Sequence, residues 1–377
     1  MNFSILSIGT ELTTGQIVNS NSTWISTQLK NNGLEARLHL TVPDETQLIL
    51  DALNFCAAQS DILFITGGLG PTTDDFTRDV VSSWLDLKLI FDEPSWKHIE
   101  DLLNSRGIKI QDIQKQQCFF PEGSEILKNN KGTANGFSIL KKINNKTLKI
   151  FVLPGPPLEI ESIWIDHIAD WLKKATVYVD KTTAHSWDTI GIPESEVATL
   201  TVTALMQLKK DFPITIGYRV HLPYVEVKLT YPSSVEFTAE SYVKKVDQAL
   251  DKITVLRNFE KASELFNKLI GSLNFAFYDF VTGGFFHKSL SQSLNKKSEW
   301  LWKQSAESMD ADFFSNEENF IALIQIDEIS CQLAADFKGK KFLKVIESPL
   351  RFNSNIDRKF QYFTEMALIE FIRFYKK

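Results

Sequence analysis

The sequence predicts an α/β protein whose first part forms a doubly wound, mostly parallel sheet, and three observations lead to this fold class. Apolar runs typical of strands alternate with helical segments along residues 1–172. Gly-rich turns follow the ends of several of these runs. The pattern then changes near residue 173, and 377 residues exceed one typical core, so two or three domains are expected.

Each element follows from a local pattern of apolar residues and stop signals, such as Gly33 just beyond the first helix. In the first domain, strands are expected at 3–8, 36–41, 61–66 and 148–153, and helices at 21–30, 44–56, 80–87, 95–104 and 158–173. A small α+β unit should follow, with strands at 176–180, 187–190, 214–218 and 224–230 and helices at 194–209 and 235–256. The last region should contain a helix, a strand at 273–277, a turn at 283–284 and further helices, which gives domains of 1–172, 173–258 and 259–377.

Composition excludes several classes of protein. Hydrophobic residues make up 43% and charged residues 23% of the chain, and the net charge of −6 carries no basic stripe, so no nucleic-acid surface is expected. The cysteines Cys56, Cys118 and Cys331 are far apart and odd in number, which fits a reducing cytoplasm rather than a disulfide framework or a zinc site. The first residues do not resemble a signal peptide, and no apolar run is long enough to span a bilayer, so no membrane association is expected.

The most informative segment is residues 66–79, TGGLGPTTDDFTRD, between an apolar strand and a helix. In an open α/β sheet this is the carboxyl end of a strand, where ligands bind. Gly67, Gly68 and Gly70 would allow the backbone to approach an anion and present N–H groups to it. Asp74 and Asp75 suit a divalent cation held beside phosphates, although a tight turn with a helix-capping Asp would also explain them.

Further loops rich in Gly, Thr, Asn and carboxylates follow other expected strands, and none contains a His, which argues against a Ser-His-Asp hydrolase. They cover residues 9–11 with 15–21, residues 43–45, residues 132–136 and the Pro-Gly-Pro-Pro run at 154–157. All except the loop at 132–136 should converge on one edge of the sheet.

These groups also have structural explanations that the sequence leaves open. Glu11 could be a solvated turn residue, Asp44 could cap the helix after it, and Asn21 could belong to a helix cap. The run at 154–157 could be only a rigid connection. Arg78 could bind phosphate or pair with Asp75 across one helical turn.

Five motifs in order resemble the CinA proteins over about 160 residues, and the first domain also resembles the molybdopterin-binding fold of the MogA and MoaB proteins. The matching segments are Ile8-Gly-Thr-Glu-Leu with Gly15-Gln-Ile-Val, the Gly-rich segment at 66–78, Pro121-Glu-Gly, Gly132-Thr-Ala with Gly136-Phe, and Leu153-Pro-Gly-Pro-Pro with Glu159. Asp75 matches the Asp that ends the family's Gly-Gly-x-Gly loop, and Asp44 matches the functional Asp of its Val-Pro-Asp-Glu segment.

The resemblance implies a cytoplasmic ADP-ribose pyrophosphatase that forms AMP and ribose 5-phosphate with a divalent cation of the Mg, Mn or Co class. Asp75 and Asp44 would be catalytic, and Asp74, Asp75 and Glu11 would hold the metal. Substrate and phosphate contacts would come from Gly9, Thr10, Asn21, Gly67, Gly68, Gly70, Pro71, Thr72, Arg78, Gly132, Thr133 and Gly155. A homodimer is expected, with a small-molecule nucleotide as substrate and neither nucleic acid nor a membrane as a partner.

The later regions resemble the other parts of this family. Residues 191–198 are similar to the start of a helix in its KH-like middle domain, but the Gly-x-x-Gly loop of RNA-binding KH domains is missing, so no RNA binding is inferred. The last region resembles a nicotinamide-mononucleotide deamidase in which Phe280 stands at the position of the nucleophilic Ser, so this activity should be lost. The alternatives are a scaffold that binds a nucleotide or pterin without turnover, and nucleotidyl transfer of the molybdenum-cofactor type.

Overall fold

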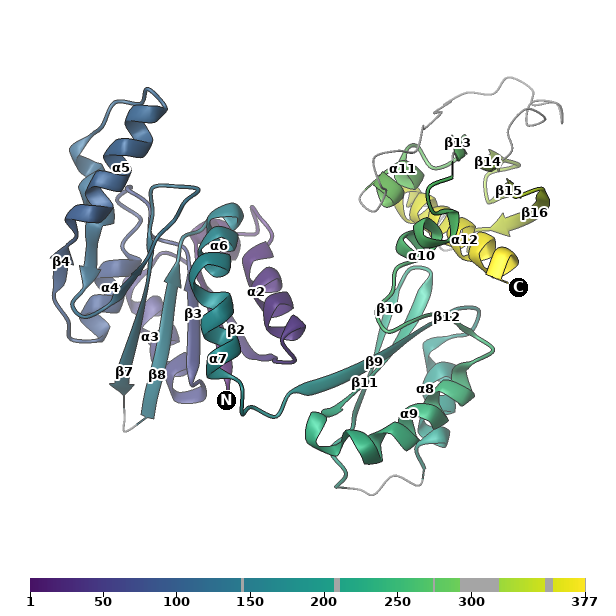
Figure 1. Ribbon diagram of the computed structural model, residues 1–377, viewed down its shortest axis with the longest axis horizontal. Helices are drawn as coiled ribbons and strands as arrows, with labels where there is room; N and C mark the ends of the chain where they lie inside the picture. The colour runs from purple at the N-terminus through teal and green to yellow at the C-terminus, as the bar shows by residue number, and fades with distance from the viewer. Residues whose placement is uncertain (144–145, 207–210, 274, 292–318, 350–354, 377) are drawn as a thin grey trace. The chain divides into compact units, whose positions relative to one another are not determined.

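The computed structural model describes residues 1–143, 146–206, 211–273, 275–291, 319–349 and 355–376. The chain divides into two compact units, Met1–Thr182 and Thr183–Lys377, and each is described by itself. Figure 1 shows the elements in chain order. Among the described residues, none of the helices combines the length and the apolar character needed to cross a membrane.

The first unit is an α/β domain built on a six-stranded sheet, as its sequence predicts (Figure 1). Four neighbouring strands, β2, β1, β3 and β8, run parallel, and β7 and β6 continue the sheet in antiparallel fashion. The strands, in sheet order, are β2 (Ala36–Val42), β1 (Phe3–Ile8), β3 (Ile62–Thr66), β8 (Lys146–Leu153), β7 (Gly136–Ile143) and β6 (Glu125–Leu127). Strands β1 and β3 are buried along their whole length, because helices cover both faces of the sheet.

Two separate apolar cores lie on the two faces of this sheet. Helices α3 (Thr46–Gln59) and α4 (Thr77–Trp84) pack on one face. Helices α2 (Ser20–Asn31), α6 (Pro157–Ile163) and α7 (Ala169–Ala175) pack on the other, with a π-helical turn at Trp164–Ile168. The remaining elements are α1 (Thr10–Thr13), β4 (Leu89–Phe91), α5 (Glu93–Ser105), a 3-10 helix at Asp112–Cys118 and β5 (Phe119–Pro121). This two-faced packing is the doubly wound arrangement.

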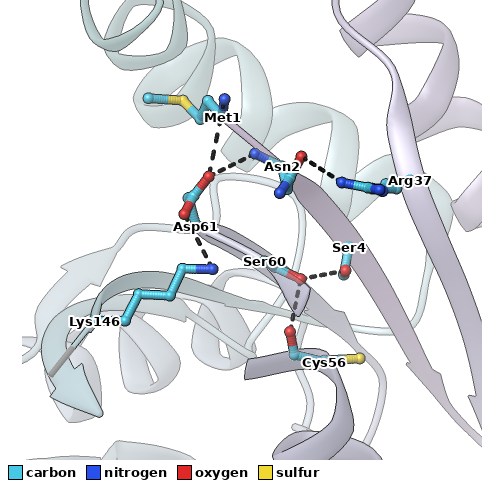
Figure 2. A network of polar contacts seen from close by, with 8 residues as sticks. All are labelled: Met1, Asn2, Ser4, Arg37, Cys56, Ser60, Asp61 and Lys146. Atoms are coloured by element: carbon cyan, nitrogen blue, oxygen red, sulfur yellow. Dashed lines mark hydrogen bonds and ion pairs between the residues drawn. The ribbon is translucent and has the colours of Figure 1, made fainter. Parts of the chain in front are cut away.

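Polar contacts join the amino ends of the central strands (Figure 2). The Asp61 carboxylate, just before β3, accepts a hydrogen bond from the N–H of Asn2 at 2.7 Å and lies 3.1 Å from the ammonium of Lys146. Burial raises the pKa of Asp61, but these two partners outweigh it and hold the pKa below the ordinary value. The hydroxyls of Ser4 and Ser60 are hydrogen-bonded nearby. These contacts fix the strands at the edge opposite the loops that follow them.

The second unit contains two four-stranded sheets (Figure 1). The first consists of β10 (Thr215–His221), β11 (Tyr224–Pro232), β9 (Thr182–Thr189) and β12 (Thr254–Arg257), and it packs on α8 (Glu194–Ala204) and α9 (Glu236–Leu250). The second consists of β13 (Ala276–Asp279), β14 (Phe320–Gln325), β15 (Ser330–Phe337) and β16 (Lys340–Glu347), with α10 (Ala262–Ile270), α11 (Phe285–Ser291) and α12 (Ile356–Lys376) against one face. Tyr224 donates a hydrogen bond from β11 to Glu365 of α12 at 2.7 Å.

Several element boundaries differ from those that the sequence predicts. Residues 176–180 form turns instead of a strand, and the helix expected at 235–256 ends at Leu250, because residues 254–257 pair with β9 as strand β12. Strands β14, β15 and β16 replace some of the helices expected after residue 284. The end of the helix expected at 194–209 falls outside the described residues.

Candidate functional site

A cavity of about 580 Å³ lies at the carboxyl ends of β1, β3 and β8, the place where the sequence analysis expects a ligand. Among the predicted site residues, Gly9, Glu11, Asn21, Asp44, Gly67, Gly68, Gly70, Pro71, Asp74, Asp75, Thr133 and Gly155 line it. Thr10, Thr72, Arg78 and Gly132 are not in the lining. The polar residues Asn19, Ser20, Thr66, Gln117 and Glu159 also line the cavity, although no contact with a ligand is predicted for them from the sequence.

The glycines of the Gly-rich loop have different structural roles. Gly67 has a φ of +100°, and a Cβ added to it would lie 2.1 Å from the carbonyl oxygen of Ile8, so only glycine fits against β1. Its N–H donates to the carbonyl of Leu153 at 3.1 Å, which corrects the expectation that this amide is available to a phosphate. Within the described residues, the N–H groups of Gly68 and Gly70 donate no hydrogen bond and stay available to an anion.

The Asp75 side chain folds back onto the same loop. Its Oδ2 accepts hydrogen bonds from the N–H of Thr72, at 3.0 Å, and from the Thr72 hydroxyl. Asp75 does not cap α4, since that helix has no side-chain cap and begins at Thr77. Thr72 therefore acts on the site through Asp75, which itself lines the cavity.

Arg78 lies behind the loop and corrects the prediction of a phosphate ligand at this position. Its side chain is only 2% exposed, and its guanidinium donates to the carbonyls of Leu69 at 2.8 Å and Gly70 at 3.1 Å. Burial lowers the pKa of Arg78 to about 10, although the nearby Asp75 raises it. Arg78 thus fixes the backbone that carries the cavity lining, and no direct ion pair with Asp75 is formed among the described residues.

Asp44 connects two loops of the site. Its Oδ2 accepts hydrogen bonds from the N–H and the hydroxyl of Thr10, at 2.7 and 2.9 Å. The alternative role as a cap of the next helix is wrong, because α3 begins at Thr46 and makes no side-chain cap contact. Thr10 itself is therefore a positioning residue that sets the carboxylate of Asp44 at the cavity.

Two further predicted residues tie the loops together. The Asn21 amide donates to the carbonyl of Gly155 at 2.7 Å, so α2 holds the Pro-Gly-Pro-Pro loop in place. Asn19, not Asn21, caps α2 by accepting the N–H of Ser22 at 3.1 Å. Gly9 leaves space for Glu11, because an added Cβ would lie 2.7 Å from the Glu11 carboxylate.

The loop at 132–136 reaches the cavity through Thr133 and Ala134, contrary to the expectation that it lies elsewhere. The reason is that β7 runs antiparallel to β8, so the segment before β7 is at the carboxyl edge of the parallel strands. The Asn129 side chain braces this loop by accepting the N–H of Gly132 at 3.0 Å and donating to Glu159 at 2.7 Å.

Glu159 and Gln117 are the main lining residues whose contribution the sequence analysis misses. Burial raises the pKa of Glu159 above its ordinary value, despite the hydrogen bond from Asn129, so its carboxyl can exchange a proton closer to neutral pH than a solvated one. Gln117 is 1% exposed and donates to the Thr133 hydroxyl at 3.2 Å, and its own Oε1 is buried without a hydrogen-bond partner among the described residues. An unpaired buried acceptor in a cavity wall suits a ligand donor.

The carboxylates at the cavity fit the divalent cation that the resemblance implies in one of two modes. Within the described part of the chain, no three His, Cys, Asp or Glu side chains come together as a metal cluster, so no preformed protein cage exists. Mg²⁺ is often held by one or two carboxylates together with phosphates and water. The carboxylates of Asp74 and Asp75, beside the N–H groups of the Gly-rich loop, fit this second mode.

Comparison with known proteins places the chain in a family. Residues 4–174 match the family described as "Probable molybdopterin binding domain". A "Putative competence-damage inducible protein" of Caldanaerobacter subterraneus is 32% identical over 297 residues, which cover 77% of this chain and 69% of that protein. The chain belongs to the CinA family of competence-damage inducible proteins. A "CinA-like protein" of Prochlorococcus marinus MIT 9515 is 33% identical over 66% of this chain and 56% of its own length.

The similarity does not extend over the full length of every CinA-family relative. The chain spans 58% of the matching protein of Caldicellulosiruptor saccharolyticus, at 34% identity. Among solved structures, the CinA protein of Thermoplasma acidophilum is similar at 27% identity and a TM-score of 0.40, over 45% of this chain and 98% of that one. MoaB of Pyrococcus furiosus is similar at 18% identity and a TM-score of 0.31, over 47% of this chain and 92% of that one.

The third region of this CinA-family chain is the last region of the sequence analysis, which begins at residue 259. Its polar atoms at residues 279–284 stabilise a turn and do not surround a nucleophilic side chain. Asp279 accepts hydrogen bonds from the N–H groups of Val281, Thr282 and Gly284 and from the Thr282 hydroxyl, so its carboxylate is fully used by the turn before α11. Phe280 packs instead against the apolar cluster around Tyr278, with ring centroids 6.4 Å apart.

Proposed function

We propose that the first unit hydrolyses the pyrophosphate of ADP-ribose to AMP and ribose 5-phosphate with the help of a divalent cation. The observation that supports this most is the charge of the cavity. None of the described lining residues is Lys, Arg or His. Five carboxylates line the cavity, those of Glu11, Asp44, Asp74, Asp75 and Glu159. A pyrophosphate can enter such a cavity only if cations offset the negative charge, which suits a metal-dependent phosphate chemistry.

The residues at the cavity have different roles, which follow from their positions. The N–H groups of Gly68 and Gly70 bind phosphate oxygens, aided by the positive end of α2, which begins at Ser20 in the cavity wall. Asp75 and Asp74 hold the cation, which offsets phosphate charge and lowers the pKa of water when it is bound. Asp44 orients the attacking water, and Thr10 keeps its carboxylate in place.

A non-catalytic scaffold that binds a nucleotide or pterin is the second candidate, and one observation favours it. The described carboxylates form no metal cluster of three or more groups before a ligand arrives. A binding protein needs no such cluster, whereas a hydrolase must complete its metal site with the substrate phosphates. Turnover therefore separates the two candidates.

The test is a turnover screen of the purified full chain with ADP-ribose, NAD, FAD and nicotinamide mononucleotide, each with Mg²⁺, Mn²⁺ and Co²⁺. ADP-ribose should be split only when a metal is present. Asp75→Ala should lose at least about a hundredfold in kcat with the fold intact, and Asp44→Ala should lose less. No turnover of any substrate, together with measurable nucleotide binding, would favour the scaffold.

We also propose that the chain forms a homodimer, as the family resemblance suggests. Light scattering at micromolar concentration should give twice the chain mass of 43.0 kDa. A monomeric mass at that concentration would refute the proposal.

A further inference from the structure

A second hollow adjoins the main cavity on the side of α2 and α6. Its volume is about 450 Å³, and four residues line both spaces: Val18, Ser20, Asn21 and Pro157. We call it the Trp24 groove, and its other lining residues are Thr23, Trp24, Thr27, Ile160 and Glu161. A ligand in the main cavity can therefore extend into the groove without leaving the protein surface.

The groove differs from the main cavity in chemistry. Trp24, Ile160 and Val18 give it an apolar wall, and Ile160 is only 1% exposed. The hydroxyl of Thr27 donates to the Thr23 carbonyl of its own helix at 2.9 Å, so it offers no free donor to the groove. The main cavity is lined by five carboxylates, whereas the groove has only Glu161. The groove therefore suits the uncharged part of a ligand whose charged part lies next door.

Trp24 is held in a fixed orientation. Its ring meets that of Trp164 edge to face, with centroids 5.6 Å apart and an interplanar angle of 85°. Trp164 is 2% exposed and belongs to the core beneath α6, so it anchors Trp24 at the surface. A fixed, half-buried indole beside an open space is a platform on which a planar aromatic ring can stack.

Glu161 gives the groove a hydrogen-bond acceptor in addition to the Trp24 ring. Its carboxylate lines the groove and, among the residues that the structure describes, makes no hydrogen bond or ion pair. An ionised carboxylate only accepts hydrogen bonds, so it favours a ring that carries an exocyclic amino group over one that carries a carbonyl at the same place. Adenine carries such a group, and hypoxanthine does not.

We propose that the Trp24 groove binds the adenine ring of the nucleotide whose phosphates lie in the main cavity, by stacking on Trp24 and by a hydrogen bond to Glu161. This inference rests on the proposed function, because it takes the main cavity as the phosphate site. Trp24 and Glu161 would then decide which base is accepted, while the chemistry stays with the carboxylates around the Gly-rich loop.

The experiment compares ligands with and without a base on the full chain. Calorimetric titration with AMP, IMP, ribose 5-phosphate and inorganic pyrophosphate, each with Mg²⁺, is carried out on the wild type, Trp24→Leu, Trp24→Phe and Glu161→Gln. The matched control is Trp84→Leu, which removes a tryptophan from the opposite face of the sheet, where Trp84 donates to Asn54 at 2.9 Å.

Trp24→Leu should weaken AMP binding about tenfold and leave ribose 5-phosphate and pyrophosphate unchanged. Trp24→Phe should keep most of the affinity for AMP, since it keeps an aromatic ring, and Trp84→Leu should match the wild type. The wild type should prefer AMP over IMP, and Glu161→Gln should reduce this preference, because the Gln amide can also donate to the carbonyl of hypoxanthine.

Two results would overturn the inference and leave the proposed function standing. In the first, the Trp24→Leu variant binds AMP as tightly as the wild type does. In the second, the affinity of this variant for AMP and its affinity for ribose 5-phosphate fall to the same extent. A wild type that binds none of the four ligands would instead refute the phosphate site itself, and the groove proposal would fail with it.

Discussion

Gly70 and Asp75 are matched in shape across the Gly-rich loop. A Cβ added to Gly70 would lie 2.4 Å from Oδ2 of Asp75, the same oxygen that accepts the hydrogen bond from the Thr72 N–H. The glycine is therefore required by the position of a carboxylate five residues later and not by its own backbone angle. The spacing between the two residues in the motif thus has a direct steric cause.

Gly70→Ala should move the Asp75 carboxylate and lower turnover of ADP-ribose by at least about tenfold, because small misplacements at a reacting centre are costly. The stability should change little, since the atoms that the added Cβ meets belong to the end of the Asp75 side chain, which can rotate away. Gly217→Ala is a suitable control, as nothing lies within 4 Å of its added Cβ. Steady-state kinetics and thermal unfolding of both variants check this, and a Gly70→Ala enzyme with wild-type kcat would contradict it.

Arg78→Met should destabilise the first unit by about 3 kcal/mol, because it leaves the buried carbonyls of Leu69 and Gly70 without their main donor. Denaturant unfolding followed by circular dichroism measures this. The exposed Arg358 makes no side-chain hydrogen bond or ion pair among the described residues and provides the control, so Arg358→Met should stay within about 0.5 kcal/mol of the wild type. A stable Arg78→Met variant would show that the guanidinium does not hold the loop.

The Asp61 network predicts a pH dependence of stability. The pKa of Asp61 lies below its ordinary value of 3.8 in the folded chain, so its stabilising contribution is present above about pH 4 and is lost as the pH falls through the folded pKa. Asp61→Asn should therefore be less stable than the wild type at pH 7, by about 1 kcal/mol or less because the pair is partly solvated. The two unfolding midpoints should converge below about pH 4, and a constant gap down to pH 3 would contradict the assignment.

The sequence predicts those parts of the fold that depend on local pattern. Strands β1 (FSILSI) and β3 (ILFIT) are mostly apolar because both of their faces are buried, and this composition predicts them to within one residue. Strand β15 is also buried nearly throughout, but it reads SCQLAADF, and its serine, glutamine and aspartate obscure the apolar pattern. Strand β12 is four residues long and depends on its pairing with β9, which no local pattern contains.

The candidate site divides in the same way. The Gly-rich loop, Asp44 and Asn21 are recognisable because each follows a strand or begins a helix. Gln117 belongs to a 3-10 helix and donates to the carbonyl of Leu69, 48 residues earlier in the chain, so only the folded chain brings it to the cavity. The position of Thr133 depends on the direction of β7, and strand direction cannot be determined from an apolar pattern.

The last prediction concerns the third region, which should release no ammonia from nicotinamide mononucleotide. By the resemblance of residues 278–284 to the deamidase signature, Phe280 takes the position of the nucleophilic Ser, and a phenylalanine has no nucleophilic atom. Phe280→Ser should not rescue the activity, because Asp279 is already occupied by the N–H groups and the hydroxyl of its own turn and cannot activate a new hydroxyl. The hydroxyl of Thr282 is fully buried and accepts the N–H of Phe286, so it cannot take over as nucleophile. An ammonia-release assay on the wild type, Phe280→Ser and Thr282→Ala checks this, and release by the wild type that Thr282→Ala abolishes would show that the third region carries an active site after all.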